Sequence, residues 1–335
     1  MKKLSILLLF TLFSGQALAG KTFKNIMKRQ KVRCGVTQGL PGFSAPDSKG
    51  NWKGIDVDVC KAVAAAVFGD PKKVEYISLS SQQRFTAIQS GEVDILSRVT
   101  THTLRRDSEM GLNFAPVTYY DGQAFMVRKK DKIKSALNLN GATICVQQGT
   151  TTELGLADYF RANKMKFKTV TFENNDEVVQ AFVKGRCDAF TTDASGLASE
   201  RTKFKNPNAY MILPEIISKE PLAPAVGHGD DQWFDVVKWT VFAMLAAEEY
   251  GLSSRNVDKF MSSKDPKISR LLGKTKGNGK ALGLNEKWAY NVIKQVGNYS
   301  EIFERNVGKD TALKLERGPN ALWTKGGLMY APPLR

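Results

Sequence analysis

The α/β character of the chain is clearest in VEYISLSSQQRFTAIQSGEVDILS, residues 74–97. Two runs in it, Val74–Leu79 and Val93–Ser97, have the β-branched and apolar composition of strands. Between them lies a short helical pattern that ends at Ser90-Gly91. A further strand and a further helix are predicted upstream, at Lys31–Val36 and Asp56–Phe68. This alternation predicts a parallel sheet flanked by helices.

The same alternation recurs over residues 142–191. Strands are predicted at Ala142–Gln147, Lys168–Phe172 and Ala189–Thr191, and helices at Thr152–Asn163 and Asp176–Lys184. The two units end in similar runs that contain Asp94 and Asp188. The pattern therefore predicts two α/β lobes of similar architecture, although it is no strict sequence repeat.

The length of 335 residues agrees with two domains, because a single core rarely grows past about 250–300 residues. We expect Gly122–Arg128 and about Glu220–Val226 to join the lobes, and the helix Gln232–Tyr250 to return to the first. The expected ranges are 20–121 and 225–335 for lobe 1, with a C-terminal extension from about 251, and 122–224 for lobe 2. Two such lobes form a hinged cleft at the carboxyl ends of their strands, where ligands bind.

Residues 1–19 have the pattern of a secretory signal peptide. Lys2-Lys3 precede an apolar run at Leu4–Phe13, and Ala17-Leu18-Ala19 is an A-x-A cleavage site. The alternative is a membrane anchor, but about ten apolar residues are too few to span a bilayer. We therefore expect cleavage before Gly20 and export to the periplasm.

The net charge of +16 is unusually positive, and much of the excess lies near the C-terminus. Residues 251–335 hold 16 Lys and Arg against 7 Asp and Glu. Basic stretches of this kind usually form solvated faces, and an exported protein rarely meets nucleic acid. We expect no nucleic-acid partner.

Four cysteines form an even set in a chain expected to reach an oxidising compartment. There is no C-x-x-C pattern, which disfavours a zinc site or a dithiol redox site. We favour disulfides between Cys34 and Cys60 and between Cys145 and Cys187, because each pair then lies within one lobe. The alternative is four buried thiols.

Three polar segments at predicted strand ends carry candidate chemistry. Ser97–Asp107 is rich in hydroxyl and guanidinium groups that suit a carboxylate, although it also fits a solvated basic loop. Gln148–Glu153 joins Gly and hydroxyls to a helix start that favours anions, or is an ordinary helix cap. Thr191–Asp193 offers a carboxylate for an ammonium group, or another cap. Together they favour a zwitterionic α-amino acid.

Several short motifs occur in a defined order along the chain: Val32–Val36, Trp52–Asp58, Gln89–Asp94, Thr103–Arg106, Gln148–Thr151 and Thr192-Asp193. In this order they resemble the polar amino acid-binding periplasmic proteins of ABC transporters, solute-binding protein family 3, and within it the general L-amino-acid-binding group. The resemblance extends through Tyr119–Gln123, Lys219–Pro224 and Asn298–Phe303. It covers essentially the whole mature chain.

The resemblance implies a type II periplasmic binding protein fold, in which each lobe is a mixed, mostly parallel sheet flanked by helices and two crossover strands form the hinge. It implies a monomeric periplasmic receptor that captures L-amino acids, of polar, acidic or broad range, by closure of the cleft. The receptor would deliver them to an ABC permease in the inner membrane, with no cofactor and no metal.

The resemblance also assigns residues to the ligand's backbone groups. Arg106 of the T-x-x-R motif would clamp the α-carboxylate, with Thr101 and Thr151 assisting from the two lobes. Asp193 would hold the α-ammonium group. The expected pocket for the ligand side chain consists of Leu40, Phe43, Arg84 and Arg98. Leu40 stands where the family usually has an aromatic wall, and an Arg facing this pocket suits acidic or amide ligands.

Two other functions fit the same scaffold. One is a periplasmic enzyme, a lyase resembling cyclohexadienyl dehydratase, which would need Glu153 or His102 as its acid or base. The other is a sensory binding protein that serves a chemoreceptor. The sequence has no nucleophile–base pair, no metal-ligand spacing and no phosphate loop, since Gly273–Lys280 has the wrong glycine spacing. We therefore expect a receptor and no enzyme.

Overall fold

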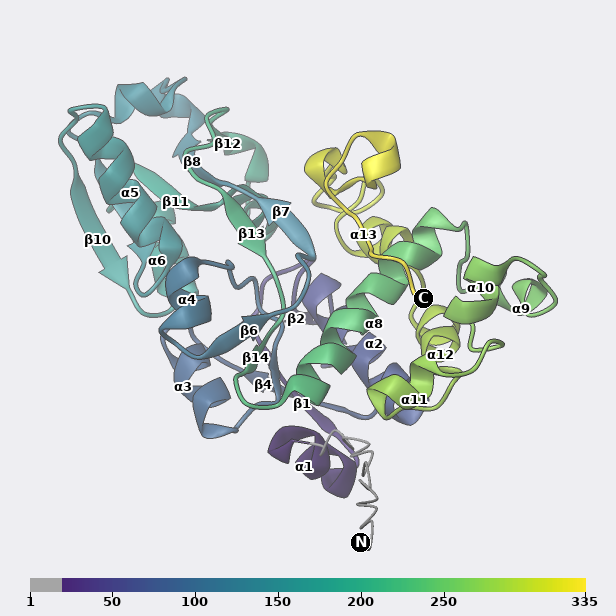
Figure 1. The fold of residues 1–335 in the computed structure, drawn as a ribbon. Coiled ribbons are helices and arrows are strands. Elements are labelled where there is room, and N and C mark those ends of the chain that lie inside the picture. Colours follow the sequence, from purple (N-terminus) through teal and green to yellow (C-terminus); the bar gives the residue numbers. More distant parts are fainter. Residues whose placement is uncertain (1–19) are drawn as a thin grey trace, which may run out of the picture.

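The structure is a computed structural model that describes residues 20–335. The chain forms two lobes with a cleft between them, and a long C-terminal segment packs beside the first lobe (Figure 1). The predicted signal peptide, residues 1–19, lies outside the described residues. Within residues 20–335, no helix has the length and apolar character needed to cross a bilayer.

Lobe 1 is built on a five-stranded sheet whose elements come from both ends of the chain. Its elements are α1 (Lys21–Arg29), β1 (Val32–Val36), β2 (Ala45–Pro46), β3 (Trp52–Lys53), α2 (Ile55–Phe68), β4 (Val74–Ser78), α3 (Gln83–Ser90), β5 (Ile95–Leu96), α4 (Leu104–Ser108), β6 (Leu112–Phe114), β14 (Ala225–Gly227) and α8 (Asp231–Glu249). The strand order is β4-β1-β5-β14-β6, with β1 parallel to both neighbours and β14 antiparallel to both of its own. The strands predicted around residues 74–97 are thus neighbours of β1.

Lobe 2 has a second five-stranded sheet. Its elements are β8 (Gln123–Arg128), η1 (Lys129–Asp131), η2 (Ala136–Leu139), β9 (Thr143–Gln147), α5 (Thr151–Ala162), β10 (Lys168–Phe172), α6 (Asn175–Val183), β11 (Ala189–Asp193), α7 (Ala194–Thr202), η3 (Pro207–Ala209) and β12 (Tyr210–Ile212). The order is β10-β9-β11-β8-β12, parallel as far as β11 and antiparallel on both sides of β8. The two mixed sheets flanked by helices form the α/β fold that we expect from the sequence.

The strands that cross between the lobes are β7 (Tyr119–Asp121) and β13 (Glu220–Leu222), which pair with each other in an antiparallel ribbon. The prediction of Gly122–Arg128 as a connecting segment is therefore wrong. Residues 123–127 are buried on both faces of β8, so this run occupies an interior position of the lobe 2 sheet. The second predicted connection, about Glu220–Val226, is only partly a hinge strand. Its first residues form β13, but its last residues form β14 in the lobe 1 sheet.

The two lobes differ in the size of their cores. In lobe 1, α2 is buried on nearly all sides because it packs between β1 and the helices α8 and α12 (Trp288–Gln295). One large core joins these elements, and a smaller core that includes residues of α3 and β6 lies on the other face of the lobe 1 sheet. In lobe 2, alternate residues of β8 point to opposite faces of the sheet, and each face has its own smaller core.

The C-terminal extension packs on lobe 1 and reaches the hinge. Besides α12 it contains α9 (Val257–Phe260), α10 (Pro266–Leu271), α11 (Asn278–Leu282), α13 (Tyr299–Asn306), η4 (Gly318–Asn320) and η5 (Trp323–Lys325). The Asn320 side chain accepts a hydrogen bond from the Tyr120 backbone N–H at 2.6 Å and donates one to its carbonyl at 3.0 Å. The yellow segment beside the hinge strands in Figure 1 therefore holds β7 against lobe 1.

Each lobe contains one disulfide, with the pairing predicted from the sequence. Cys34 on β1 is bonded to Cys60 on α2, and Cys145 on β9 to Cys187 just before β11. All four cysteines are fully buried. Each bond joins a strand to a segment packed on it within one lobe, so neither restricts movement between the lobes.

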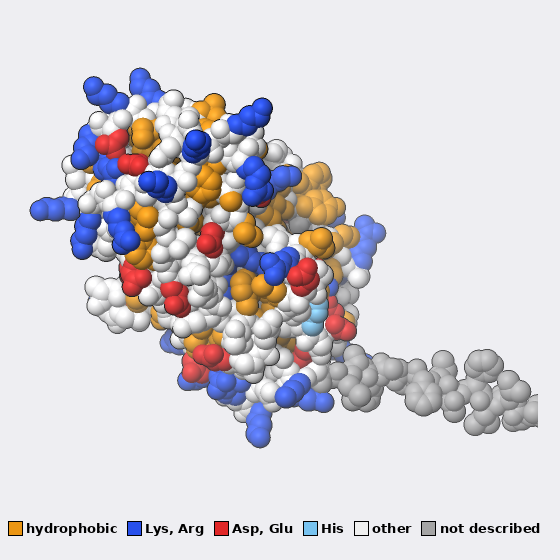
Figure 2. Space-filling model, turned by 90° about the vertical axis from the view of Figure 1, so that its left-hand side faces the viewer, with side chains coloured by type: hydrophobic (Ala, Val, Ile, Leu, Met, Phe, Trp, Pro, Cys, Tyr) orange, Lys and Arg blue, Asp and Glu red, His pale blue; other side chains and the backbone are white. Residues whose placement is uncertain are grey.

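Charged side chains are dispersed over the surface in the view of Figure 2. Lys and Arg are spread over this face, with Asp and Glu interspersed among them. On this face the positive charge forms no continuous stripe of the kind that a nucleic-acid backbone would require.

Candidate functional site

A cavity of about 470 Å³ lies between the lobes, at the carboxyl ends of their parallel strands. This volume is typical of small-molecule sites. Lobe 1 contributes Thr37, Gln38, Gly39, Leu40, Ser81, Arg84, Arg98, Val99 and Thr101 to its lining. Lobe 2 contributes Gln147, Thr150, Thr151, Thr152, Asn174, Asn175, Asp176, Glu177, Thr192, Asp193, Ser195, Gly196 and Glu200. None of these described lining residues is aromatic.

Hydrogen bonds across the cleft hold the lobes in a closed arrangement. The Ser81 hydroxyl of lobe 1 donates to the Gln147 side chain of lobe 2 at 3.1 Å. At another part of the rim, the Ser199 hydroxyl of lobe 2 donates to the Pro41 carbonyl at 2.6 Å. The cavity is thus enclosed by both lobes, and a ligand inside it would contact both.

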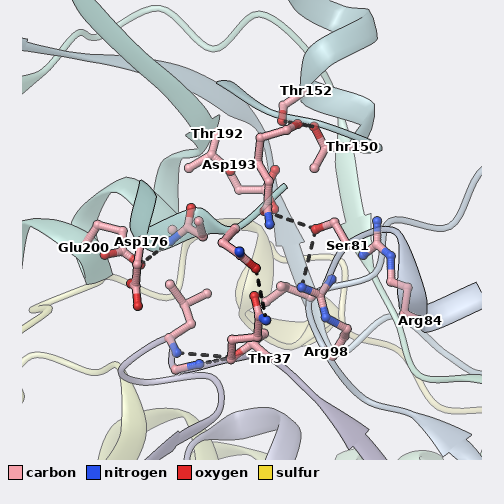
Figure 3. A pocket seen from close by; sticks show the side chains of 18 of the residues that line it. Thr37, Ser81, Arg84, Arg98, Thr150, Thr152, Asp176, Thr192, Asp193 and Glu200 are labelled. Atoms are coloured by element: carbon pink, nitrogen blue, oxygen red, sulfur yellow. Dashed lines mark hydrogen bonds between the residues drawn. The ribbon is translucent and has the colours of Figure 1, made fainter. Parts of the chain in front are cut away.

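Two buried guanidinium groups from lobe 1 line the cavity with spare donor capacity. Arg84 Nη1 reaches the Thr100 hydroxyl at 3.3 Å, and Arg98 Nη2 reaches the Ser81 hydroxyl at 3.4 Å, both long for charge-assisted bonds. The Nε atoms of both arginines are buried without a hydrogen-bond partner in the described chain. Burial lowers the pKa of Arg98 to about 10, so it stays charged at neutral pH. Figure 3 shows both arginines on the lobe 1 side of the cavity.

Arg106 lies directly behind this surface. Its Nη1 donates to the Thr101 carbonyl at 2.8 Å, and its guanidinium lies 5.1 Å from the centre of the Phe85 ring. Arg106 is buried but is not among the lining residues of the cavity. Burial lowers its pKa to about 10, while the carboxylates of Glu220 and Asp193 oppose this shift. The Arg106 charge therefore acts on the cavity from just beneath Thr101.

Thr101 and Thr151 meet at the hinge end of the cavity, as expected for residues from opposite lobes. Their hydroxyl oxygens are 3.3 Å apart, and both hydroxyls donate to Glu220 Oε2, at 2.6 and 2.7 Å. Thr151 is the first residue of α5, so its backbone N–H has no acceptor within the helix. That N–H is available to an anion in the cavity.

Asp193 provides a carboxylate from lobe 2. Its side chain does not cap a helix, as the alternative interpretation required. It stands at the N-cap of α7, but its side chain makes no capping hydrogen bond within the described chain. The N–H and hydroxyl of Ser195 instead donate to Asp121, the last residue of β7. Burial, with Asp121 and Glu220 nearby, raises the pKa of Asp193 well above its usual range. A cation in the cavity would favour the ionised form of this carboxyl group.

The loop that carries Arg98 and Thr101 is held from beneath by Asp56. Asp56, near the start of α2, accepts hydrogen bonds from the Ser97 hydroxyl at 3.3 Å and from the Val99 N–H at 3.2 Å. Val99 has φ of 44°, a left-handed conformation that is costly for a β-branched residue. The strained turn places Arg98 and Thr101 on the cavity side, and Asp56 helps to hold it there.

The backbone geometry requires a glycine at position 54, two residues before Asp56. The φ of Gly54 is 128°, and a Cβ atom there would lie 2.0 Å from the carbonyl oxygen of Phe43. The absence of a side chain lets the 40–44 loop rest on the start of α2, where Asp56 N donates to the Phe43 carbonyl at 3.0 Å. The Trp52–Asp58 motif thus supports two walls of the cavity.

One predicted pocket residue, Phe43, is not in the pocket. Leu40 lines the cavity, but Phe43 is 1% exposed in the lobe 1 core, and its ring packs edge-on against Tyr119 at 5.3 Å. The reason is the tight turn at 40–43, closed by the Phe43 N–H to Leu40 carbonyl bond, which directs Phe43 inward.

The two candidate acid–base residues of the enzyme alternative lie outside the cavity lining. Glu153 accepts a hydrogen bond from the Gly149 N–H at 2.9 Å, beside the start of α5. The His102 ring stacks on Phe114 with centres 4.4 Å apart, and its side chain is 41% exposed. Both residues have local structural contacts that account for them.

Sequence reasoning missed Glu220, Asp121 and Asp56 as functional groups. All three lie in motifs that carry the family resemblance, Lys219–Pro224, Tyr119–Gln123 and Trp52–Asp58. Glu220 is the one charged residue of the predicted crossover segment Glu220–Val226, and this isolated carboxylate is the signal that could have identified it. Asp121 lies just outside the predicted segment Gly122–Arg128 and carries no such signal.

Comparisons with known proteins agree with this geometry. Residues 32–308 match the family model "Bacterial extracellular solute-binding proteins, family 3". The chain is 58% identical over 321 residues to the general L-amino acid-binding periplasmic protein of Rhizobium johnstonii, covering 95% of this chain and 94% of that one. It is 52% identical to the glutamate/glutamine/aspartate/asparagine-binding protein of Rhodobacter capsulatus, covering 95% of each.

A solved structure is similar over nearly its whole length. It is the ABC transporter periplasmic binding protein from Brucella ovis with glutathione bound, which has a TM-score of 0.92, 53% identity, and coverage of 94% of this chain and 99% of that one. Together with the two-lobed fold and the cavity between the lobes, these matches show that the chain belongs to the bacterial extracellular solute-binding proteins of family 3.

Proposed function

We propose that this chain is the periplasmic receptor of an ABC transporter for L-amino acids, which captures its ligand by closing the two lobes. The observation that carries the proposal is the arrangement of charge in the cavity. Buried guanidinium groups with spare donors come from lobe 1, and an uncapped carboxylate comes from lobe 2. A zwitterion supplies the opposite charge to each group.

The α-carboxylate of the ligand would bind beside Thr101 and Thr151. The Thr151 N–H at the start of α5 would donate to it, and the Arg106 charge beneath Thr101 would stabilise it. Asp193 would accept the α-ammonium group, whose charge restores the ionised carboxylate in a buried place. Ligands that lack either group would leave a buried charge without a partner.

Arg84 and Arg98 favour acidic and amide side chains. Both line the cavity, and their Nε atoms lack acceptors within the described residues. A carboxylate or amide oxygen of the ligand side chain would accept hydrogen bonds from these guanidinium groups. The name of the Rhodobacter capsulatus relative includes glutamate, glutamine, aspartate and asparagine, which agrees with this preference. The name of the Rhizobium johnstonii relative specifies general L-amino acid binding, so the range is expected to be broad with a polar optimum.

The remaining parts of the proposal follow from the family. Residues 1–19 would direct export and be removed, and the mature protein would act as a monomer that delivers its ligand to permease subunits in the inner membrane. It would not be an enzyme, since the relatives at more than 50% identity are named as binding proteins.

Calorimetry of residues 20–335 with L-glutamate, L-glutamine and L-alanine tests the proposal. We expect the protein to bind L-glutamate and L-glutamine more tightly than L-alanine. We also expect each ligand to be recovered chemically unchanged. Arg106→Ala should weaken L-glutamate binding at least about 100-fold, because a buried carboxylate loses its charge partner. Wild-type affinity of Arg106→Ala would reject the assigned clamp, and consumption of the ligand would reject the receptor.

A second candidate ligand is glutathione. The Brucella ovis structure is described with glutathione bound, and the cavity here extends from the arginines to Asn174–Glu177 of lobe 2. The γ-glutamyl group of glutathione carries the same α-ammonium and α-carboxylate as glutamate, so it fits the same clamp. Glutathione that competes with L-glutamate in calorimetry would place both ligands in one site; no binding of glutathione would restrict the site to amino acids.

A further inference from the structure

We propose that Glu220 is a positioning residue that latches the two lobes together beside the carboxylate clamp, and that it thereby sets how long a ligand remains bound. This inference deepens the proposed function and rests on it for the ligand. One oxygen of Glu220 accepts hydroxyl hydrogen bonds from both lobes, while Glu220 itself lies on a hinge strand.

The contacts of Glu220 account for both carboxylate oxygens. Oε2 accepts from Thr101 of lobe 1 at 2.6 Å and from Thr151 of lobe 2 at 2.7 Å. Oε1 accepts from the Ser218 hydroxyl at 2.6 Å. The Glu220 residue is 2% exposed. A carboxylate buried to this extent requires such donors, because burial without them is costly.

Opening of the cleft must break this arrangement. Thr101 and Thr151 move with different lobes, so a hinge-strand carboxylate can follow at most one of them. Separation therefore removes a charge-assisted hydrogen bond, and such bonds are roughly twice as strong as neutral ones. Water that enters the open cleft replaces the lost donor only in part. The Glu220 contacts consequently favour the closed state.

The latch also prepares the clamp for a ligand. With both hydroxyls donated to Glu220, the two threonine side chains have fixed rotamers. The Thr151 N–H and the guanidinium groups then remain for the ligand carboxylate. Arg106 lies close enough to Glu220 that this carboxylate opposes the burial-induced lowering of the Arg106 pKa. The Arg106 charge thus serves both the latch and the ligand.

The other hinge carboxylate, Asp121, shows that this role is specific to Glu220. Asp121 lies opposite Glu220 in the β7–β13 ribbon. Its side chain accepts hydrogen bonds from Gly122 and Ser195, which both belong to the lobe 2 side. In the described chain, Asp121 therefore joins no group of lobe 1 to lobe 2.

The experiment measures dissociation of radiolabelled L-glutamate from residues 20–335 after a chase with unlabelled ligand. Glu220→Gln keeps the side-chain size but removes the charge, and we expect dissociation to accelerate about tenfold with little change in the association rate. Ser218→Ala is the matched control, because it removes a bond to the same carboxylate without touching the two inter-lobe bonds. Its dissociation rate should stay within about twofold of wild type.

A double-mutant cycle with Thr151→Val distinguishes the latch from a general structural role of Glu220, because it measures the coupling of the two side chains in the dissociation rate. If the latch acts through the Thr151 hydroxyl, Glu220→Gln should accelerate dissociation much less in the Thr151→Val background than in wild type. Equal acceleration in both backgrounds, or dissociation of Glu220→Gln within twofold of wild type, would overturn the proposal.

The latch can be tested even if the proposed ligand is wrong. Should the wild-type protein bind neither L-glutamate nor L-glutamine, the proposed function fails while the unliganded chain still reports on closure. Small-angle X-ray scattering would then compare radii of gyration without ligand. Glu220→Gln should be more expanded than wild type and Ser218→Ala should not; equal radii for all three would reject the latch.

Discussion

The two lobes contribute opposite charge to the cavity and are stabilised in different ways. Lobe 1 places Arg84 and Arg98 on the lining, whereas lobe 2 places Asp193 there. Each lobe has a core on both faces of its sheet, but one of the lobe 1 cores is much larger because it includes the C-terminal extension. Lobe 1 is therefore the more rigid platform for the anionic groups of a ligand, and lobe 2 closes over it with the partner for the cation.

The largest effect is expected from removal of charge on the lobe 1 side. Arg98→Ala should weaken L-glutamate binding about 1,000-fold, because truncation of one partner of a buried charge pair costs about 4 kcal/mol. Arg105→Ala is the control, since Arg105 belongs to the same loop but its side chain is 71% exposed and paired with Glu109. Calorimetry should show wild-type affinity for Arg105→Ala. Equal losses in the two variants would indicate general damage to the loop.

The same experiment on lobe 2 sharpens the comparison. Asp193→Asn should weaken L-glutamate binding by a similar factor but leave binding of a ligand without the α-ammonium group, such as glutarate, little changed. Arg98→Ala should weaken both ligands. If Asp193→Asn weakens L-glutamate and glutarate equally, lobe 2 does not supply the ammonium partner.

The next largest effect concerns the two disulfides, one in each lobe. The chain separations of 26 residues for Cys34–Cys60 and 42 for Cys145–Cys187 predict losses of about 3.5 and 4 kcal/mol when each pair is replaced by serine. Because both lobe 2 cores are much smaller than the main lobe 1 core, loss of Cys145–Cys187 should produce a separate, earlier unfolding transition in calorimetry. Loss of Cys34–Cys60 should lower the main transition instead. A single transition in both variants would show that the lobes unfold as one unit.

Much of this organisation was predictable from the sequence, and the exceptions have a physical cause. Strand and helix patterns depend on local spacing, so the β1–α2–β4–α3–β5 order could be placed. The family resemblance, rather than spacing, pointed to Arg84, Arg98, Thr101, Thr151 and Asp193, which line the cavity. Whether an apolar run such as Gln123–Arg128 crosses the hinge or enters a sheet depends on its partners, which spacing does not show. Glu220 and Phe43 depend on contacts across more than one segment, and these arise only in the folded chain.

A smaller effect is expected from Asp56, which is buried in lobe 1 under the Arg98 loop. Burial raises the pKa of Asp56 to about 7, above its unfolded value near 3.9. The folded protein therefore holds a proton that the unfolded chain releases, and this stabilisation is lost as the pH rises through 7. Between pH 5 and pH 8 the loss is about 3 kcal/mol. Asp56→Asn should remove this slope in urea unfolding, since a neutral amide can still accept the Val99 N–H.

Asp47 is a control of opposite sign for the same measurement. It is a half-buried turn residue whose pKa is lowered to about 2 by its hydrogen bonds with Lys53 and Asn51. Its contribution is present at neutral pH and is lost as the pH falls below about 4. Asp47→Asn should therefore leave the slope between pH 5 and pH 8 unchanged. If the slope of Asp56→Asn equals that of wild type, another group causes the pH dependence.

The smallest effect tests the link between the C-terminal extension and the hinge. Asn320 is 2% exposed, and its side chain forms two hydrogen bonds with the Tyr120 backbone. Asn320→Ala leaves a partly buried N–H and carbonyl of β7 without these partners, which should cost about 1–2 kcal/mol in urea unfolding. Leu328→Ala, a control in the same extension at a side chain that is 57% exposed, should change stability by less than about 0.5 kcal/mol.

The contact between Asn320 and Tyr120 is expected to affect movement of the lobes as well as the stability of lobe 1. Asn320 fixes β7 to lobe 1 as far as Tyr120, while Asp121 at the end of the strand is already bonded to lobe 2. We therefore expect β7 to bend between these two residues. Asn320→Ala should release it, and small-angle scattering of the unliganded protein should then show a larger radius of gyration than for Leu328→Ala. Equal radii would mean that the extension stabilises lobe 1 alone and leaves the hinge unconstrained.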